Sequence, residues 1–214
     1  MILNRTINIY KQNALDLIDW VSKMIQELEN KNAKPDGVYL AGGSLLREDS
    51  PDRDIFLVYK KFESIPDNLP GCFMGLNSAL EFDIVEDCES FDTILNGKDI
   101  QTFRLSNSLT NVKIEIIPVC LELGNLKSWF HFMNKTFPLS IQKVYYDFKN
   151  KCFSQDIVEI NPIYVSSGVP KNPKFSLMKY VNYYPDSEFI FSAKALEEVL
   201  NNNEIFDKKQ DKND

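Results

Sequence analysis

The sequence is most constrained between Gly37 and Tyr59, which reads GVYLAGGSLLREDSPDRDIFLVY. Two apolar runs, VYLA near its start and IFLVY at its end, are typical of buried β-strands. The first run stops at Gly42-Gly43-Ser44, a turn signal that interrupts a strand. The second run begins directly after two acids one residue apart, Asp52 and Asp54. The stretch therefore predicts a strand, a glycine turn, a polar connection and a second strand headed by acids.

Asp52 and Asp54 would project from the same side of that strand, about 7 Å apart along the backbone, because side chains alternate between the two faces. Carboxylates this close repel each other, which raises a pKa unless a cation lies between them. A hard divalent cation such as Mg²⁺ prefers oxygen ligands and leaves room for substrate phosphates. The glycines lack a Cβ and let backbone N–H groups approach an anion closely. Phosphate on the turn and metal on the strand would make a nucleotide site.

Residues 41–56, AGGSLLREDSPDRDIF, resemble the signature of the DNA polymerase β-like nucleotidyltransferase superfamily. They look closest to its poly(A) polymerase and CCA-adding branch, and small nucleotidyltransferases of tailed bacteriophages are similar. The resemblance implies an α/β (α+β) fold, with a mixed β-sheet flanked by helices and a small C-terminal helical lobe. It also implies that Asp52 and Asp54 bind Mg²⁺ or Mn²⁺, and that an NTP is bound by Gly42, Gly43 and Ser44.

The same resemblance implies a third carboxylate on a later strand, and Glu115 is the candidate for this catalytic and metal-binding role. It lies in VKIEIIPV, residues 112–119, where apolar residues alternate with Lys113 and Glu115. This run and residues 101–105 flank a Ser-Asn-Ser turn region, so together they predict a β-hairpin beside the strand of Asp52. Glu115 would then face the metal. The alternative is a solvated edge residue beside Lys113.

The C-terminal part, residues 175–200, is similar to the helical segment that follows the catalytic domain in poly(A) and CCA enzymes. In that family a basic residue followed by an aromatic faces the bound nucleotide, and Lys179-Tyr180 matches the pair. The resemblance thus implies that Lys179 contacts the triphosphate and that Tyr180 packs nearby; the alternative is a solvated lysine. The expected division is a catalytic domain over 1–165, a helical lobe over 166–206 and a disordered tail over 207–214.

Other segments give coarser predictions. Residues 12–29 place apolar side chains at helical spacing and predict one amphipathic helix. Proline and glycine in residues 60–80 favour a loop with short helical pieces at most. Residues 126–132 predict a short helix, and the alternation of residues 139–147 predicts a strand.

Composition limits the partners. The 214 residues are enough for a single core, and no run approaches the roughly 20 apolar residues that span a bilayer, so no membrane partner is expected. The first five residues lack the apolar run of a signal peptide, which favours a cytoplasmic protein, and the resemblance suggests a phage gene expressed in a bacterial host. A net charge of −7 weighs against long duplex nucleic acid.

Cysteine and histidine usage narrows the chemistry. The four cysteines show no CxxC spacing, so a zinc site is not indicated. His131 is the single histidine, which leaves little for a Ser-His-Asp triad. The chemistry is therefore expected to depend on carboxylates and a metal ion.

The expected function is metal-dependent transfer of a nucleoside monophosphate from an NTP to an acceptor hydroxyl, with release of pyrophosphate. The acceptor could be an RNA 3′ end, a protein or a small molecule. Arg53 stands where the family has an apolar residue, and the spacer 45–51 is short. These features motivate a rival, a degenerate nucleotidyltransferase acting as a nucleotide sensor or protein-binding inhibitor, in which Arg53 replaces a cation by pairing with one carboxylate. A third possibility is that the acids cap a strand of an unrelated α/β domain.

Overall fold

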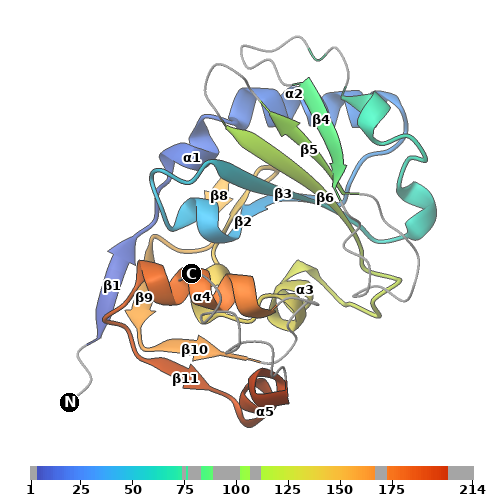
Figure 1. The fold of residues 1–214 in the computed structure, drawn as a ribbon. Helices are drawn as coiled ribbons and strands as arrows, with labels where there is room; N and C mark the ends of the chain where they lie inside the picture. The colour runs from blue at the N-terminus through green and yellow to red at the C-terminus, as the bar shows by residue number, and fades with distance from the viewer. Residues whose placement is uncertain are drawn as a thin grey trace, which may run out of the picture.

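The protein is built on one seven-stranded mixed sheet, seen in a computed structural model that describes residues 4–73, 76, 83–88, 102–106, 112–166 and 173–201 (Figure 1). The strand order is β4-β5-β6-β3-β2-β7-β8. Only β3 and β6 run parallel, while every other pair in this sheet is antiparallel. The strands are β2 (Gly37–Ala41), β3 (Asp52–Tyr59), β4 (Asp83–Cys88), β5 (Thr102–Ser106), β6 (Lys113–Cys120), β7 (Tyr145–Asp147) and β8 (Cys152–Phe153).

The strands around the glycine turn are confirmed. β2 and β3 pair antiparallel with Ala41 opposite Asp54, and the turn between them forms the short 3₁₀ helix η1 (Gly42–Leu45). The hairpin predicted from residues 101–119 is confirmed as well, because β5 pairs antiparallel with β6. β6 lies between β5 and β3, with Glu115 opposite Asp54 in register. The interpretation of Glu115 as a residue on a sheet edge is therefore wrong.

Two smaller sheets connect the chain ends to the segment after β8. β1 (Arg5–Asn8) pairs antiparallel with β9 (Ile157–Asn161). β10 (Ile163–Val165) pairs parallel with β11 (Phe189–Phe191). Helix α4 (Pro173–Tyr183) lies between the main sheet and the β10–β11 pair, and helix α5 (Ala193–Asn201) follows β11 at the bottom of the view (Figure 1). The predicted tail 207–214 lies outside the described residues.

The single helix predicted over residues 12–29 is wrong in one respect, because the chain forms two helices, α1 (Gln12–Leu15) and α2 (Ile18–Asn30). At the break, the N–H of Leu17 bonds to the carbonyl of Ala14 (3.1 Å), a tighter turn than an α-helix makes. This turn buries Leu17, whereas Leu15, which the helical pattern put on the apolar side, is 43% exposed.

Two further predictions are displaced. The helix expected over residues 126–132 is α3 (Trp129–Thr136), because Ser128 caps its start by accepting a hydrogen bond from the N–H of His131 (3.2 Å). The strand expected over residues 139–147 is reduced to β7, since the 3₁₀ turn η4 (Ser140–Gln142) replaces its first part. The Gln142 side chain accepts from the N–H of Leu139 (3.1 Å) and closes this turn. Residues 60–73 are loop with two 3₁₀ turns, η2 (Phe62–Ser64) and η3 (Pro70–Cys72), as predicted.

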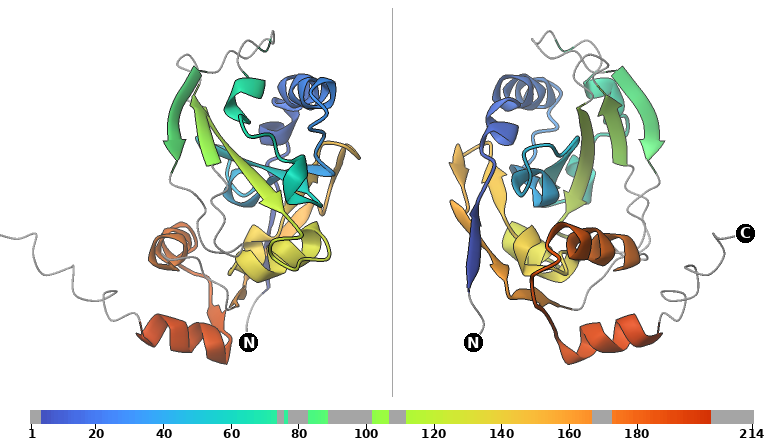
Figure 2. Two further views of the ribbon diagram at one scale, coloured as in Figure 1. Left: turned by 90° about the vertical axis from the view of Figure 1, so that its right-hand side faces the viewer. Right: turned by 60° about the vertical axis from the view of Figure 1, so that its left-hand side comes forward.

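Helices cover both faces of the main sheet. On one face, Ile55 and Leu57 of β3 pack in a core that includes the buried side of α2. On the other, Phe56 and Val58 pack with Trp129 of α3. The views in Figure 2 show α2 and α3 on either side of the sheet. The expected mixed sheet flanked by helices is thus confirmed, and β3 is buried on both faces from Ile55 onward. No helix in the described part of the chain is long and apolar enough to cross a membrane.

Candidate functional site

One pocket of about 210 Å³ lies where the η1 turn, the start of β3, the middle of β6, the end of α3 and helix α4 meet. The residues proposed from the sequence for metal or nucleotide binding come from four separate parts of the chain, yet all of them border this pocket. The full lining is Gly42, Gly43, Ser44, Ser50, Asp52, Asp54, Phe56, Glu115, Ile117, Phe132, Thr136, Phe137, Pro138, Gln142, Lys179 and Tyr180.

The turn that forms one wall is tightly packed. Gly42 has φ = +80°, a conformation that favours glycine. A Cβ on Gly43 would come within 3.1 Å of the Tyr180 hydroxyl oxygen, so a larger residue would require the α4 side chain to shift by a few tenths of an ångström. Ser44 borders the pocket with a buried Oγ that has no hydrogen-bond partner among the described residues. Because buried polar atoms are normally paired, this hydroxyl is one that a ligand could satisfy.

Three carboxylates face the same pocket, and they disturb one another. Burial, then the charge of Glu115, then that of Asp52 raise the pKa of Asp54 to about 7, while Lys179 and Arg104 act in the opposite direction. At neutral pH Asp54 is therefore close to half protonated in the absence of a cation. A hard cation bound among these oxygens would remove the penalty, so the chemistry of the donor set fits Mg²⁺ or Mn²⁺.

The acids are not gathered as a closed metal site in this structure. Within the described ranges, no three His, Cys, Asp or Glu side chains converge closely enough to hold a metal ion. Glu115 instead lies 3.8 Å from Arg104, its cross-strand neighbour on β5, and its side chain is 25% exposed. Ligation by Glu115 would therefore require this ion pair to open or to shift.

Arg104 was missed by the sequence reasoning. It lies opposite Glu115 in the β5–β6 register, so pairing the two strands of the predicted hairpin in this register would have placed Arg104 beside Glu115. Opposite charges facing each other across an antiparallel pair are a common stabilising arrangement. The sequence alone did not predict this pair, because the register depends on the length of the turn and that length is ambiguous in the sequence.

Helix α4 brings Lys179 and Tyr180 to the pocket. Tyr180 is buried and lies against Gly43, whereas Lys179 is exposed at the rim and contributes the positive charge that lowers the pKa of Asp54. One turn further on, the ring of Tyr183 lies under the Arg47 guanidinium, with 3.9 Å from Cζ to the ring centroid. α4 is thus seated on the segment that leads out of the glycine turn.

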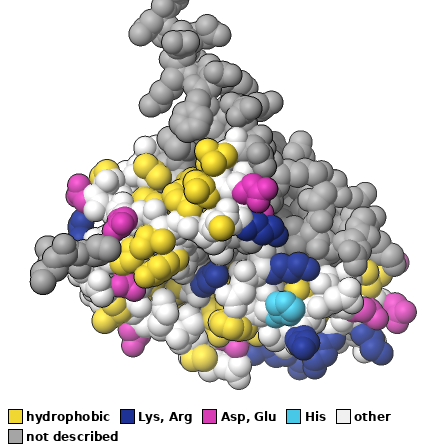
Figure 3. Space-filling model, turned by 90° about the horizontal axis from the view of Figure 1, so that it is seen from below, with side chains coloured by type: hydrophobic (Ala, Val, Ile, Leu, Met, Phe, Trp, Pro, Cys, Tyr) yellow, Lys and Arg dark blue, Asp and Glu magenta, His cyan; other side chains and the backbone are white. Residues whose placement is uncertain are grey.

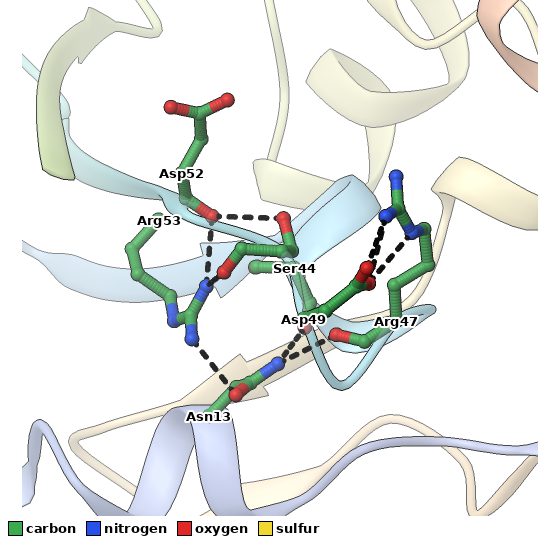
Figure 4. Close-up of polar contacts among 7 residues, drawn as sticks. Asn13, Ser44, Arg47, Asp49, Asp52 and Arg53 are labelled. Atoms are coloured by element: carbon green, nitrogen blue, oxygen red, sulfur yellow. Dashed lines mark hydrogen bonds and ion pairs between the residues drawn. The ribbon is translucent and has the colours of Figure 1, made fainter. Parts of the chain in front are cut away.

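Arg53 does not take a cation's place between the acids, so that part of the degenerate-enzyme hypothesis is wrong. Its side chain projects from the opposite face of β3, as strand alternation requires. Its guanidinium donates to the carbonyls of Ser50 and Asp52 and to the Asn13 side chain (2.8 Å), and it forms no ion pair with Asp54 among the described residues (Figure 4). The carboxylates of Asp52 and Asp54 are therefore not occupied by the Arg53 guanidinium.

The far end of the pocket is apolar, which the sequence did not indicate. Phe56 lies there with its ring centroid 5.6 Å from that of Phe137 and 6.0 Å from that of Phe132. The Thr136 hydroxyl is turned to the Phe132 carbonyl (2.9 Å), which uses its proton within the helix. The pocket therefore offers charge and backbone polarity at one end and aromatic surface at the other.

Comparison with known proteins adds no family assignment, because no family model matches this chain and no curated protein matches it. The function is therefore inferred from the sequence motif and the geometry of the site.

Proposed function

We propose that this protein is a metal-dependent nucleotidyltransferase with the DNA polymerase β-like fold, which transfers a nucleoside monophosphate from an NTP to an acceptor hydroxyl and releases pyrophosphate. The observation that carries the proposal is the single pocket shared by the glycine-serine turn, Asp52 and Asp54, Glu115, and Lys179. These groups lie up to 137 positions apart in the sequence, from residue 42 to residue 179. Their meeting supports a common substrate better than a strand that merely begins with acids.

Asp52, Asp54 and Glu115 would hold Mg²⁺ or Mn²⁺. When bound, the metal lowers the pKa of the attacking hydroxyl and neutralises charge on the transferred phosphate and the departing pyrophosphate. Asp54 and Glu115 face each other across β3 and β6, so their carboxylates are held at one end of the pocket by paired backbones. Asp52, two residues earlier on β3, adds a third oxygen donor from the same strand face.

The triphosphate would lie on the η1 turn. Gly42 already donates its N–H to the Val144 carbonyl (3.2 Å), so its role is the positive φ that starts the turn. We assign the phosphate contacts to Gly43 and to Ser44, whose Oγ is unpaired. Lys179, exposed at the pocket rim, would add a cation beside the phosphates.

The nucleobase would lie against the apolar end formed by Phe56, Phe132 and Phe137. Stacking on aromatic side chains contributes about 1–3 kcal/mol per base and depends little on base identity. The pocket volume of about 210 Å³ lies below the roughly 300–1,000 Å³ common for ligand sites, so the base would be only partly enclosed.

The acceptor side is marked by positive charge on the outside of α3. His131 and Lys135 are exposed and lie four residues apart on one side of α3. Lys127, also exposed, lies just before the helix, where its N–H donates to His131 Nδ1 (3.3 Å). Figure 3 shows Lys and Arg side chains gathered beside the histidine on this face. Phe132 and Thr136 of the same helix border the pocket. Such a short positive strip fits an RNA 3′ end better than a long duplex.

The first test measures the melting temperature with each of the four NTPs, with and without Mg²⁺ or Mn²⁺. A ligand that binds only the native state raises this temperature by mass action. We expect a metal-dependent rise for at least one NTP, followed by incorporation of that nucleotide into an acceptor. No rise with any NTP would contradict the proposal.

The second candidate is a catalytically degenerate protein of the same fold that acts as a nucleotide sensor or protein-binding inhibitor. The observation that favours it is the Arg104–Glu115 ion pair, which occupies the third carboxylate. It predicts an NTP-induced rise in melting temperature that is the same without metal, and no transfer to any acceptor.

A further inference from the structure

A buried polar network lies behind the pocket, on the face of β3 opposite the acids (Figure 4). Its two central side chains, Asn13 of α1 and Arg53 of β3, are each only 7% exposed, and neither borders the pocket. They are 40 residues apart in the sequence and meet through a hydrogen bond of 2.8 Å from Arg53 Nη2 to Asn13 Oδ1. No sequence motif pointed to Asn13.

Asn13 holds the glycine turn. Its Nδ2 donates to the carbonyl of Ser44 (2.6 Å) and to the carbonyl of Arg47 (2.8 Å). The first carbonyl belongs to the residue whose hydroxyl is unpaired in the pocket wall, and the second lies three residues further along the connection. Oδ1 accepts from Arg53, so the donor and acceptor groups of this side chain all bond to segments that border the pocket or to Arg53.

Arg53 holds the acid end of β3. Its Nη1 donates to the carbonyl of Ser50 and to that of Asp52 (3.2 Å), and Ser50 Oγ donates to the Asp52 carbonyl as well (3.3 Å). A continuous chain of hydrogen bonds therefore runs from the Ser44 backbone through Asn13 and Arg53 to the Asp52 backbone. The two ends of this chain are the two halves of the pocket, the turn and the acids.

Burying this polar network costs free energy that apolar side chains in the same place would not cost, which argues that the network has a positional role. Burial lowers the pKa of Arg53, and the charges of Asp16, Asp52 and Asp54 offset only part of this loss of hydration, while the hydrogen bonds of the guanidinium go to neutral acceptors. Apolar residues of similar volume commonly pack a buried ionic position without loss of stability. Apolar side chains cannot donate hydrogen bonds to the four backbone carbonyls that this pair holds, those of Ser44 and Asp52 on either side of the connection 45–51 and those of Arg47 and Ser50 within it.

We infer that Asn13 and Arg53 are positioning residues, which set the placement of the Gly43-Ser44 turn relative to Asp52 and Asp54. This role rests on the proposed function, since it concerns the spacing between bound phosphate and metal. A misplacement of about 1 Å at such a site can reduce the rate about a hundredfold. The departure from the family pattern at Arg53 is then part of the site's support and no sign of decay.

The test compares three variants for binding of Mg²⁺-tripolyphosphate, a probe that presents the phosphate chain without a base, by calorimetry well below every variant's Tm. Asn13→Ala removes the whole network link. Asn13→Asp keeps an acceptor for Arg53 but loses both donors to the turn, so it separates support of the turn from satisfaction of the buried guanidinium. Tyr59→Phe is the matched control, because it removes a buried hydrogen bond to the Ala33 carbonyl (3.3 Å) at the other end of β3.

We expect both Asn13 variants to bind the probe about tenfold more weakly than wild type, because the turn is no longer pre-organised. Asn13→Asp should nevertheless stay folded at the assay temperature, because its carboxylate pairs with Arg53, and Tyr59→Phe should keep its affinity. Wild-type affinity in Asn13→Asp, or an equal loss in Tyr59→Phe, would overturn the inference while leaving the proposed function in place.

A double variant, Asn13→Leu with Arg53→Met, keeps the test decisive if Asn13→Ala does not fold. It replaces the pair by apolar side chains of similar size and is expected to fold while losing affinity. Wild-type affinity in this protein would also overturn the inference. A wild-type protein that binds neither the probe nor any NTP would overturn the proposed function and this role together.

Discussion

Strand β3 has two halves of opposite character. From Ile55 to Tyr59 every residue is buried, and the side chains alternate between the two cores on either face of the sheet. From Asp52 to Asp54 every residue is ionisable, with Asp52 exposed, Arg53 buried among hydrogen bonds and the pKa of Asp54 strongly raised. The same short strand thus combines a well-packed region with an electrostatically unfavourable one.

The contrast teaches that stability and the proposed chemistry are separated along one backbone. The packed half contributes stability through burial of large apolar side chains, which is worth about 1.5–3 kcal/mol each. The charged half lowers the free energy of unfolding, because like charges are held together in a partly buried pocket. A pre-organised binding site requires this combination, in which the packed half of β3 holds the mutually repelling acids of the other half in place.

The largest expected effect comes from the charged half. Asp54→Ala should reduce nucleotide transfer about a thousandfold or more, because an interaction made in the transition state is lost. Initial rates with the NTP that shows the metal-dependent rise in Tm would measure this. Transfer at the wild-type rate would contradict the assignment of Asp54.

The fold should survive this change. Asp36→Ala is the matched control, because Asp36 is also an acid beside the main sheet but pairs with Lys60 (3.1 Å) and does not border the pocket. We expect Asp36→Ala to transfer at a rate close to wild type. An equal loss of activity in both variants would show that removal of any acid near β3 disturbs the protein.

The second prediction concerns the packed half. Leu57 is fully buried in the core on the α2 face, so Leu57→Ala should lower the free energy of unfolding by about 3 kcal/mol through lost burial and a residual cavity. Urea denaturation measures this loss. If the halves are separate, the affinity of the folded variant for Mg²⁺-NTP stays within about twofold of wild type.

The third prediction is a pH dependence of stability caused by Asp54. Its pKa is about 7 in the fold and near 3.8 when unperturbed, so between these values the native state keeps a proton that the unfolded state has lost. The free energy of unfolding should therefore fall as pH rises from about 4 to about 7. The full shift corresponds to about 4 kcal/mol, and we expect about 2 kcal/mol because pocket water can relax around the carboxylate.

Asp54→Asn should remove most of this slope, because asparagine does not titrate. The charged groups that face the position, Asp52, Glu115, Lys179 and Arg104, are unchanged in this variant. Mg²⁺ added at pH 8 should raise the Tm of wild type and leave that of Asp54→Asn nearly unchanged. The measurement is chemical denaturation at a series of pH values. A slope that persists in Asp54→Asn would assign the titration to another group.

The sequence was enough to predict the elements that carry periodic signals. The strands on both sides of the glycine turn and the hairpin over residues 101–119 follow from apolar runs and alternation, whereas the helices near residues 173–201 were expected from the family resemblance. Strand alternation also predicted that Glu115 faces away from the core that buries Ile114 and Ile116. These predictions depend on local patterns that tertiary contacts did not override.

What could not be predicted depends on contacts between distant segments. Asn13 reads as one polar residue in a helix, and only the fold places it against the carbonyls of Ser44 and Arg47. The strand expected from residue 139 was replaced by a turn because the Gln142 side chain bonds to the Leu139 backbone. The aromatic end of the pocket likewise joins residues from β3 and α3 that show no spacing relation to one another.

The fourth prediction tests the contact between Tyr180 of α4 and Gly43 of the turn. Gly43→Ala should weaken Mg²⁺-tripolyphosphate binding about fivefold to tenfold, because the new Cβ would meet the Tyr180 hydroxyl oxygen at 3.1 Å. Tyr180→Phe removes that oxygen and keeps the ring. The double variant should therefore recover most of the lost affinity, which calorimetry would measure. Equal affinities for the single and double variants would mean that the glycine is needed for direct approach of the phosphate alone.

The smallest expected effect concerns the acceptor. Lys127→Glu with Lys135→Glu reverses the charge of the two lysines at the start and end of α3 and should raise KM for a short RNA acceptor about threefold at low salt, with kcat nearly unchanged. Lys23→Glu with Lys31→Glu makes the same change in net charge at the same spacing on α2, where both lysines pair with acids, and should leave KM unaltered. The difference between the two pairs should shrink as salt is raised, since exposed charges are screened. An unchanged KM in the α3 variant would direct the search to a protein or small-molecule hydroxyl.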